Sequence, residues 1–369
     1  MIESFEAHRC WAEIDRAALR HNAQAAREIS GPDVALLAVI KANGYGHGLV
    51  AVADALRDHA QLFGVANVQE ALAARNAVPH PVIILGPALP AERAAIVEHR
   101  FIASISSYEE AVAFSAVADG RSVYLNCKID TGMGRMGIRE SDAVEEIVRI
   151  SKLPNIEIHS VSSHLPSADE DPLFTTEQLA RVDRLITRLR SEMPGSYLVH
   201  TLPSAGVIAF PRSAYDIVRA GLMIYGISPL PEQQGLLRPA LTLKAHVVLL
   251  REVAAGSSIS YGRTFTTPSA MRVATLSVGY ADGFPRAVSN RGAAVLIGGR
   301  RCAVLGRVTM DLVMVDVSEV PEVNVGDEAV LIGRQGDEEI LATEMAQRAG
   351  TIAWEIFTGI GSRVARVYV

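Results

Sequence analysis

Residues 34–48, Val-Ala-Leu-Leu-Ala-Val-Ile-Lys-Ala-Asn-Gly-Tyr-Gly-His-Gly, contain the strand and loop around which the chain is organised. The first seven residues are apolar and often branched, as in a buried strand, and a loop with three glycines follows Lys41. Lys41 is therefore predicted at a strand end, where its amine is either paired or held partly neutral. A neutral amine is a nucleophile or base, so Lys41 is a candidate Schiff-base lysine; the alternative is a lysine that reaches into water.

Composition favours the functional interpretation of Lys41. Only four of the 35 basic residues are lysines, so arginine carries most of the positive surface charge. The formal net charge of −6 and the lack of a basic cluster interleaved with aromatic residues argue against a nucleic-acid partner. A small anionic ligand remains compatible with this charge.

The three cysteines are widely spaced and odd in number, which predicts reduced thiols rather than a disulfide framework or a thiolate metal site. We expect no metal. Residues 1–6 lack the basic and apolar regions of a signal peptide, and no apolar run reaches membrane-spanning length. The expectation is a soluble, cytoplasmic protein without a membrane partner.

Outward from residues 34–40, strand-like runs alternate with helical patterns. A helix is predicted over 11–30, and later helices over 49–59, 69–76, 91–99, 108–118, 141–152 and 176–193. The eight predicted strands are 34–40, 62–66, 81–85, 101–105, 122–129, 157–163, 197–202 and 217–224. This alternation predicts an α/β fold of the TIM (β/α)8 barrel type. A doubly wound open sheet is the competing fold, although no Gly-x-Gly-x-x-Gly follows the first strand.

The pattern changes after residue 229. Residues 228–235 are rich in Pro, Gly and Gln and are predicted to be a linker. Beyond them, strand-like runs dominate, at 241–253, 272–278, 294–297, 312–317, 328–332 and 363–369, with helices only at 342–349 and 352–357. We predict a barrel over 11–230 and a mostly β C-terminal domain made of 1–10 and 236–369.

Chemically useful residues are predicted at the carboxyl ends of the barrel strands, where barrel enzymes place their active sites. Lys41 follows the first strand, and a glycine-rich loop at 128–137 follows the fifth and carries Arg135. His164 follows the sixth. Ser204 comes after the seventh strand, and an arginine and a glycine stand in or after the eighth, in the run Arg219-Ala220-Gly221-Leu222.

The last two strand ends form a candidate phosphate cradle. Loops after strands seven and eight bind phosphate in many barrels, which points to Ser204, Gly221 and Leu222. A lysine, a phosphate cradle and buried arginines together suggest pyridoxal phosphate held as a Schiff base. Each residue also has a structural interpretation: Arg219 paired with Asp216, His164 as a core histidine, and Ser204 as a helix cap.

The stretch Lys-Ala-Asn-x-Tyr-Gly-His-Gly around Lys41 resembles the cofactor-lysine signature of the alanine racemases. Further similarities run along nearly the whole chain, at 63–66, 128–137, 163–165, 168–170, 204–205, 219–226, 260–262, 279–283 and 306–311. The resemblance implies a barrel followed by a β domain, and a head-to-tail homodimer whose two active sites are shared between subunits.

The resemblance also implies two catalytic bases. Lys41 would bind pyridoxal phosphate and act as the base facing the D-substrate, and Tyr261 of the partner subunit would be the base on the opposite face. Inversion needs one group to remove the α-proton and another to return a proton from the far side. Since the reference pKa of tyrosine is about 10, Tyr261 needs help, which His164, linked onward to Arg219, would supply.

Other residues of the resemblance bind the cofactor and substrate. Arg219 would donate to the pyridine nitrogen, and an arginine cannot protonate it. Arg135 would contact the cofactor phenolate or the substrate carboxylate, and Met310 of the partner subunit would line the pocket. Lys128 matches a position where the amine is carbamylated. The phosphate would be held by Tyr45, Ser204, Gly221 and Leu222.

Two positions depart from the family pattern. Trp354 stands where the family usually has a tyrosine that reaches the phosphate region and narrows the pocket, and Pro203 replaces a common asparagine. Trp354 would take the tyrosine's place among the cofactor-binding residues.

The expected function is interconversion of L- and D-alanine with pyridoxal phosphate, supplying D-alanine for peptidoglycan. A serine or broad-specificity racemase of the same fold is an alternative that Trp354 favours. A fold-related decarboxylase usually has an acid at the pyridine nitrogen, which Arg219 disfavours. A cofactor carrier built from the barrel alone leaves the Tyr261 motif unexplained.

Overall fold

A computed structural model describes residues 8–369, and residues 1–7 of the expected β domain lie outside the described part of the chain. The contacts divide the chain into two compact units. The barrel unit comprises residues 19–44 and 49–238. The β unit comprises the described residues up to 18, the short segment 45–48, and residues 239–369. Residues 11–18 therefore pack with the β unit.

The barrel unit contains eight parallel strands in the order β10-β2-β3-β4-β5-β6-β8-β9, which confirms the barrel prediction. The ring is completed where a bridge joins Pro203, just after β9, to Arg219 in β10. The strands are β2 (Ala35–Val39), β3 (Leu62–Val65), β4 (Val82–Ile84), β5 (Ile102–Ile105), β6 (Val123–Asp130), β8 (Ile156–Ser162), β9 (Leu198–His200) and β10 (Ile217–Ala220).

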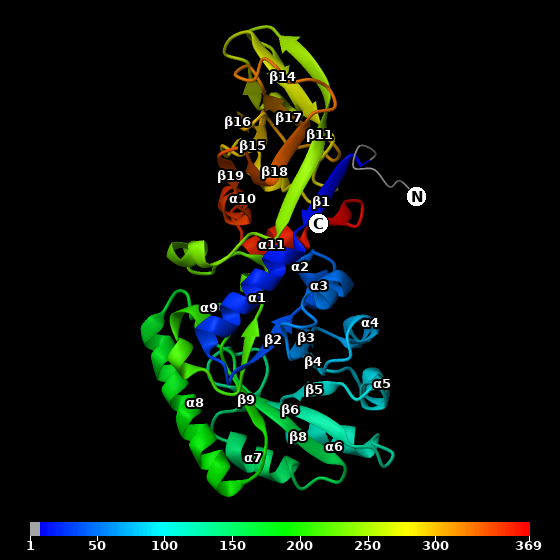
Figure 1. Cartoon of the computed structure of the whole chain (residues 1–369), viewed down its shortest axis with the longest axis vertical. Helices are drawn as coiled ribbons and strands as arrows, with labels where there is room; N and C mark the ends of the chain where they lie inside the picture. Colours follow the sequence, from blue (N-terminus) through cyan, green and yellow to red (C-terminus); the bar gives the residue numbers. More distant parts are fainter. Residues whose placement is uncertain (1–7) are drawn as a thin grey trace. The chain divides into compact units, whose positions relative to one another are not determined.

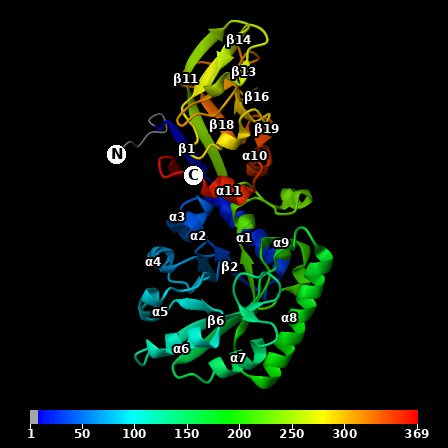
Figure 2. The ribbon, with the colours of Figure 1, turned by 180° about the vertical axis from the view of Figure 1, so that it is seen from behind.

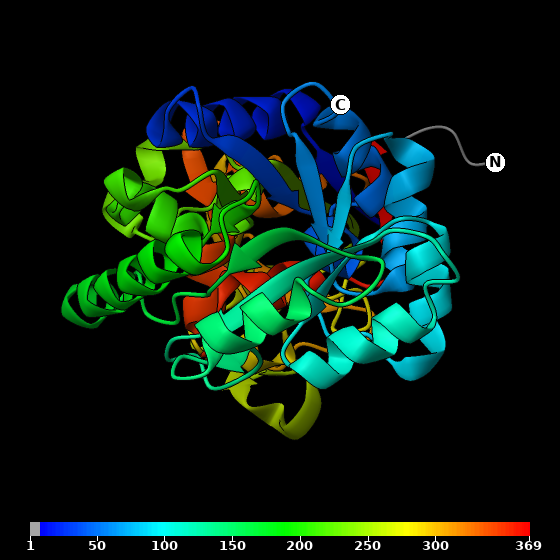
Figure 3. The same ribbon diagram turned by 90° about the horizontal axis from the view of Figure 1, so that it is seen from below.

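Helices surround these strands, as the view along the barrel unit shows (Figure 3). Figure 2 shows α3, α4 and α5 on the outer side of the strands. Several helices begin where the sequence offers a capping side chain: Asn67 before α4, Ser107 before α6 and Asp171 before α8. The helices are α3 (Leu49–Ala55), α4 (Val68–Ala77), α5 (Arg93–Glu98), α6 (Tyr108–Ala116), α7 (Ala143–Ile150), α8 (Pro172–Glu192) and α9 (Ser204–Ala209).

Two predicted elements were wrong at one end. The helix predicted from residue 11 is α1 (Arg16–Ser30), because residues 10–14 form β1 (Cys10–Ile14) in the β unit. Trp11 and Ile14 are fully buried there, and this strand pairs with β11 (Leu241–Val253) and β20 (Ala365–Tyr368). The eighth barrel strand ends at Ala220, and the apolar run after it continues as a short 3-10 helix, η4 (Leu222–Tyr225).

The β unit is built around the long strand β11, seen in yellow-green in Figure 1. β11 pairs with β1, β14 and β18, always antiparallel. Two short helices, α10 (Ala342–Ala349) and α11 (Ala353–Thr358), precede the last strand. The other strands are β12 (Ser258–Ile259), β13 (Phe265–Thr266), β14 (Met271–Leu276), β15 (Ala294–Ile297), β16 (Arg300–Ala303), β17 (Val313–Asp316), β18 (Glu328–Gln335) and β19 (Glu338–Ile340). The mostly β character of this region is as predicted.

Within residues 8–369, none of the helices combines the length and apolar character needed to cross a membrane.

Candidate active site

A left-handed turn begins at Lys41, shortly after β2. The next residues have positive φ, with Ala42 at 53°, Asn43 at 54° and Gly44 at 61°. The amide of Gly44 donates to the carbonyl of Ile40 at 2.8 Å, which closes one left-handed turn. Left-handed geometry costs roughly 1–2 kcal/mol for each residue with a Cβ, so other contacts must hold this turn in place.

Two side chains of the barrel unit hold the turn. The Oδ1 of Asn43 accepts from the amide of Leu49 at 3.0 Å, at the start of α3. The Oε1 of Glu70 accepts from the amide of Ala42 at 2.7 Å. The sequence analysis gave Glu70 no role, because a glutamate in the first turn of a helix resembles an ordinary capping residue.

The amine of Lys41 lies within reach of other positive charges. Burial and the charge of Arg135 lower its pKa, and Glu70 opposes this effect. Burial lowers the pKa of Lys128 to about 7, with Arg219, Arg135 and Lys41 adding to the shift. Lys41, Lys128, Arg135 and Arg219 therefore form one cluster of cations, which favours anionic ligands and neutral amines.

Arg219 lies buried in this cluster without an acidic partner among residues 8–369. Its Nη atoms donate to the carbonyls of Ser163, His200 and Thr201 at 2.7–2.8 Å. Burial and Arg135 lower its pKa to about 10. The suggested ion pair with Asp216 is absent, since that carboxylate accepts from the amide of Val199 at 2.7 Å. Within residues 8–369, no group accepts a hydrogen bond from the Nε–H of Arg219.

Arg219 also sets the protonation of two histidines. Its Nη1 lies 2.6 Å from the Nδ1 of His200, and its Nη2 lies 3.3 Å from the Nδ1 of His164. Because arginine can only donate, both Nδ1 atoms accept and each ring carries its proton on Nε2. Burial and then the charge of Arg219 lower the pKa of His164 to about 2 and that of His200 well below its usual value, so both rings are neutral.

The sequence analysis missed His200, which links Arg219 to the interior of the barrel. Its Nε2–H faces the Oγ of Ser160 at 3.4 Å. The Ser160 hydroxyl donates to the Oδ1 of Asn126 at 3.1 Å, and the side-chain Nδ2 of Asn126 donates to the Oγ of Ser104 at 2.9 Å. The only signal in the sequence was a polar residue in the short run at 197–202. These hydrogen bonds hold the imidazole of His200 in place, and His200 in turn contacts the guanidinium of Arg219.

His164 is held by a second residue that the sequence analysis missed. The Nε2 of Gln178, buried in α8, donates to the carbonyl of His164 at 2.9 Å and to the hydroxyl of Thr131 at 2.8 Å. Thr131 in turn bonds Ser163 at 2.7 Å. The loops after β6 and β8 are therefore tied together beside the cation cluster.

The loop that carries Arg135 is organised by Asp130. The carboxylate of Asp130 accepts from the amides of Gly132, Met133 and Gly134 at 2.8–3.2 Å. Burial raises the pKa of Asp130, but these amides outweigh it and leave the pKa below the ordinary value. A charged Asp130 thus shapes the loop.

Hydrogen bonds join Ser204, after β9, to the residues that follow β10, where the sequence predicts a phosphate cradle. The Oγ of Ser204 accepts from the amide of Gly221 at 2.9 Å and from that of Met223 at 3.3 Å. Ser204 therefore does not act as the cap of its own helix. Leu222 is the first residue of η4, and this helix is fastened to β2 because Tyr225 Oη donates to the carbonyl of Val39 at 3.0 Å.

Tyr45 and Trp354 meet within the β unit. Burial raises the pKa of the Tyr45 hydroxyl to about 12, while a hydrogen bond with the side chain of Trp354 opposes that rise. Gly46 follows Tyr45 with a positive φ, and a Cβ there would lie 2.1 Å from the carbonyl oxygen of Phe357 in α11. The loop 45–48 therefore packs closely on α11, the helix that carries the residue departing from the family pattern.

Tyr261 stands on an exposed, strained loop of the β unit. Its side chain is 68 % exposed. The flanking Ser260 and Arg263 have positive φ, at 63° and 50°. The hydroxyl of Ser260 donates to the carbonyl of Arg307 at 2.5 Å, which fastens the loop at its base. The tyrosine is thus held on a defined loop while remaining accessible.

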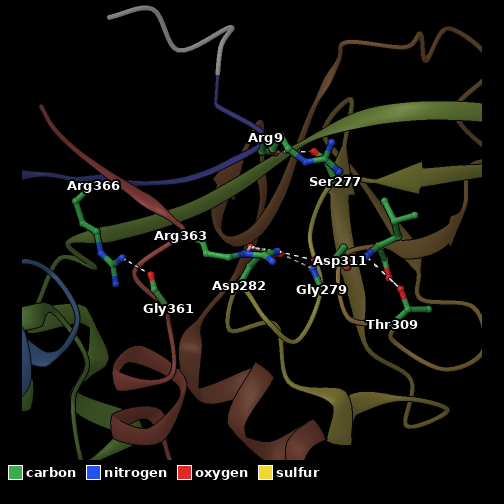
Figure 4. Close-up of polar contacts among 10 residues, drawn as sticks. Arg9, Ser277, Gly279, Asp282, Thr309, Asp311, Gly361, Arg363 and Arg366 are labelled. Carbon is green, nitrogen blue, oxygen red and sulfur yellow. Dashed lines mark hydrogen bonds and ion pairs between the residues drawn. The ribbon is translucent and has the colours of Figure 1, made fainter. Parts of the chain in front are cut away.

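Met310, 51 % exposed, belongs to one of two glycine-containing motifs that lie together. Figure 4 shows Gly279 and Asp282 of one motif near Asp311 of the other. Its carbonyl accepts from the amide of Ala281 at 3.0 Å. The buried carboxylate of Asp282 accepts from the amide of Gly279 at 2.9 Å and from Arg363 at 2.8 Å. Arg363 also pairs with Asp311 at 2.9 Å, next to the methionine. Residues 279–283 and 306–311 are therefore one framework.

Comparison with known proteins gives these motifs a common context. Residues 14–229 match the alanine racemase N-terminal domain and residues 240–368 match the alanine racemase C-terminal domain. The chain belongs to the alanine racemase family. It is 40% identical over 368 residues to the alanine racemase of Halothermothrix orenii, covering 97% of this chain and 96% of that protein.

Solved alanine racemases share the fold. The Bacillus anthracis alanine racemase with bound L-Ala-P has 35% sequence identity and a TM-score of 0.90, covering 98% of this chain and 95% of that chain. The Bartonella henselae alanine racemase, with covalently bound pyridoxal phosphate, has 26% identity and a TM-score of 0.89, covering 98% of this chain and 99% of that chain.

Proposed function

We propose that this protein interconverts L- and D-alanine with pyridoxal phosphate as cofactor. The observation that carries the proposal is the cluster of Lys41, Lys128, Arg135 and Arg219 at the carboxyl ends of the barrel strands. These cations have too few acids to neutralise them, and their mutual repulsion is relieved by an anionic ligand. A phosphorylated cofactor and a substrate carboxylate supply that charge.

The residues present fit the cofactor. Lys41 would hold it covalently, because its lowered pKa makes the amine easier to deprotonate and so a better nucleophile. Ser204, Gly221, Leu222 and Tyr45 would bind the phosphate, with Trp354 supporting the hydroxyl of Tyr45. When bound, pyridoxal phosphate supplies a carbonyl carbon that takes the substrate amine and a conjugated ring that stabilises the charge left when the α-proton departs.

Arg219 would direct its Nε–H at the ring nitrogen. No protein group takes this donor in the described chain, whereas the Nη atoms are occupied by carbonyls and imidazoles. A guanidinium donates a hydrogen bond without giving up its proton, so the ring nitrogen stays unprotonated. This arrangement disfavours decarboxylase chemistry, which depends on a strongly electron-withdrawing ring.

Two bases on opposite faces would carry out the inversion. The Nζ of Lys41 takes or returns the α-proton on one face, and the hydroxyl of Tyr261 does so on the other. His164 carries its proton on Nε2, and this N–H can donate to the tyrosine oxygen. Such a donor, together with the nearby positive charge of Arg219, would favour the tyrosinate that acts as base.

Arg135 would bind the substrate carboxylate or the cofactor phenolate. The neutral fraction of Lys128 can add carbon dioxide, forming a carbamate with release of one proton, and the negative carbamate would then pair with Arg135. Met310 would close the substrate pocket against larger side chains.

We further propose that Tyr261 and Met310 act in the active site of a second copy of the chain. Support comes from their exposure: each is a hydrophobic side chain more than half exposed on a well-anchored loop. A symmetric homodimer would bury both and complete two equivalent sites.

The cellular role we propose is the supply of D-alanine for peptidoglycan in the cytoplasm. The three cysteines, all buried and free, fit a reducing compartment. Trp354 in place of a tyrosine supports a second candidate, a racemase with broader specificity that also accepts serine.

Incubation of the purified protein with each alanine enantiomer in D2O tests the proposal. We expect loss of optical activity and incorporation of deuterium at Cα from both sides. Relative turnover of alanine and serine separates the two candidates, and a protein that binds pyridoxal phosphate yet racemises neither amino acid would overturn both.

A further inference from the structure

The carboxylate of Glu70 joins the ends of two neighbouring barrel strands. Its Oε2 accepts from the amide of Ala66, just after β3, at 2.8 Å. Its Oε1 accepts from the amide of Ala42, three residues beyond the end of β2 at Val39, at 2.7 Å. Glu70 itself is fixed in the first turn of α4, because its amide donates to the Oδ1 of Asn67 at 3.0 Å.

A second glutamate shows what part of this arrangement is ordinary helix capping. Glu110 occupies the same place in α6, with its amide donating to Ser107 at 3.2 Å and its Oε2 accepting from the amide of Ser106 at 2.7 Å. The other oxygen of Glu110 has no hydrogen bond within residues 8–369. The capping function is therefore common to both glutamates, and the contact with the turn after Lys41 distinguishes Glu70.

That contact reaches a left-handed turn of the barrel unit, in which three consecutive residues have positive φ. Ala42 is in the left-handed region, with φ 53° and ψ 52°, and follows Lys41 directly. The side chain of Asn43 also ties this turn to the barrel unit, through the amide of Leu49. Bonds to a carboxylate are stronger than neutral ones, so Glu70 contributes the stronger of the two ties.

We propose that Glu70 is a positioning residue that holds the left-handed turn after Lys41 and thereby aims the lysine amine at the cofactor. The inference rests on the proposed function, because it assigns a role toward pyridoxal phosphate. In this proposal, the backbone of the turn sets the direction of the Lys41 side chain, and no contact with that side chain is needed.

Comparison of three substitutions tests this role. Glu70→Gln puts an NH2 group against one of the two amides, so one bond is lost. Glu110→Gln makes the same change in α6, and Asn67→Ala removes the cap of α4 without touching the bond to Ala42. Each apo protein is titrated with pyridoxal phosphate, and the dissociation constant, the visible absorption maximum and the melting temperature are recorded.

We expect Glu70→Gln to weaken pyridoxal phosphate binding by about tenfold, the effect of one lost charge-assisted hydrogen bond, and to shift the absorption maximum. The two control variants should melt earlier but bind within about twofold of the unchanged protein, because helix capping affects stability and not the turn. Should Glu70→Gln not fold, Glu70→Asp, which keeps the charge but is too short to span both amides, should give the same loss of affinity.

Equal affinity and an equal spectrum for the Glu70 and Glu110 variants would overturn the inference while leaving the proposed function intact. Failure of the unchanged protein to bind pyridoxal phosphate would instead overturn the proposed function, and the positioning role with it.

Discussion

Two loops of this protein carry the proposed bases. Both contain residues with positive φ, but they differ in how far the side chain of the base is exposed. The turn after Lys41 is left-handed and tied by Asn43 and Glu70, and its lysine lies half-buried in a cluster of cations. The loop of Tyr261 also has positive φ and a firm anchor at Ser260, but its tyrosine is 68 % exposed.

The difference indicates where each environment comes from. Burial and Arg135, a residue of the same barrel unit, lower the pKa of Lys41, so the proposed base on this face needs no residue of a second chain to lower its pKa. Tyr261 has a rigid support at Ser260 but remains exposed. In the proposed dimer, His164 of a second copy would donate a hydrogen bond to its hydroxyl.

Replacing Lys41 gives the largest expected effect. Lys41→Ala should abolish covalent cofactor binding and lower racemisation by at least about 10³-fold, since it removes both the attachment point and one base. Because it also removes one of the repelling cations, the melting temperature of the apo protein should not fall. Measured racemisation, absorption and melting curves check this, and a strongly destabilised variant would break the account of the cation cluster.

Replacing Tyr261 should cost activity and leave cofactor binding unchanged. Tyr261→Phe is expected to lower racemisation by about 10²–10⁴-fold, because it removes a proton-transferring group while the ring remains. Titration of the apo variant with pyridoxal phosphate is the control. A variant with full activity would show that the exposed loop has no part in the chemistry.

Lys128 gives a pH-dependent effect on stability. The unfolded chain, with a lysine pKa of about 10.4, binds a proton that the folded chain lacks above its pKa of about 7, so the free energy of unfolding rises across this window. Lys128→Met should therefore stabilise most below about pH 7, by on the order of a few kcal/mol, and the gain should vanish above about pH 10.5.

Urea unfolding in buffers freed of carbon dioxide measures the Lys128 effect. Lys152→Met is the matched control, because it removes an exposed lysine by the same substitution. If the free energies of unfolding of the Lys128 variant and the unchanged protein differed by the same amount at every pH, the lowered pKa of Lys128 would be contradicted.

The smallest effect is expected at Trp354. Trp354→Phe removes the hydrogen bond to Tyr45, which should raise the pKa of that hydroxyl further and weaken cofactor binding by about three- to tenfold. Tyr45→Phe should cost more, because it also removes the proposed phosphate contact, and the double variant should bind about as weakly as Tyr45→Phe alone, because Trp354 acts through that hydroxyl. Additive losses would mean that the two residues act separately.

Much of the fold could be predicted because the strands are short apolar runs separated by recognisable caps. The prediction was wrong at residues 11–14, where an apolar pattern continuous with α1 hid a strand whose partners lie more than 200 residues away. It was also wrong after Ala220, where the apolar run continues through a turn made possible by Gly221.

Candidate site residues could be proposed from the sequence where a residue type itself suggests chemistry, as for Lys41 and Arg219. His200, Gln178 and Glu70 were missed because their importance lies in which backbone or side chain they reach across the barrel. No local pattern in the sequence encodes those distances.

The most direct test of the central claim, that each active site takes one base from each of two chains, is to mix the two inactive variants. Refolding equal amounts of Lys41→Ala and Tyr261→Phe together should restore about a quarter of the unchanged activity, since half the dimers are mixed and one of their two sites has both bases. If both bases came from the same chain, every site would lack one of them, and the mixture would remain as inactive as its components.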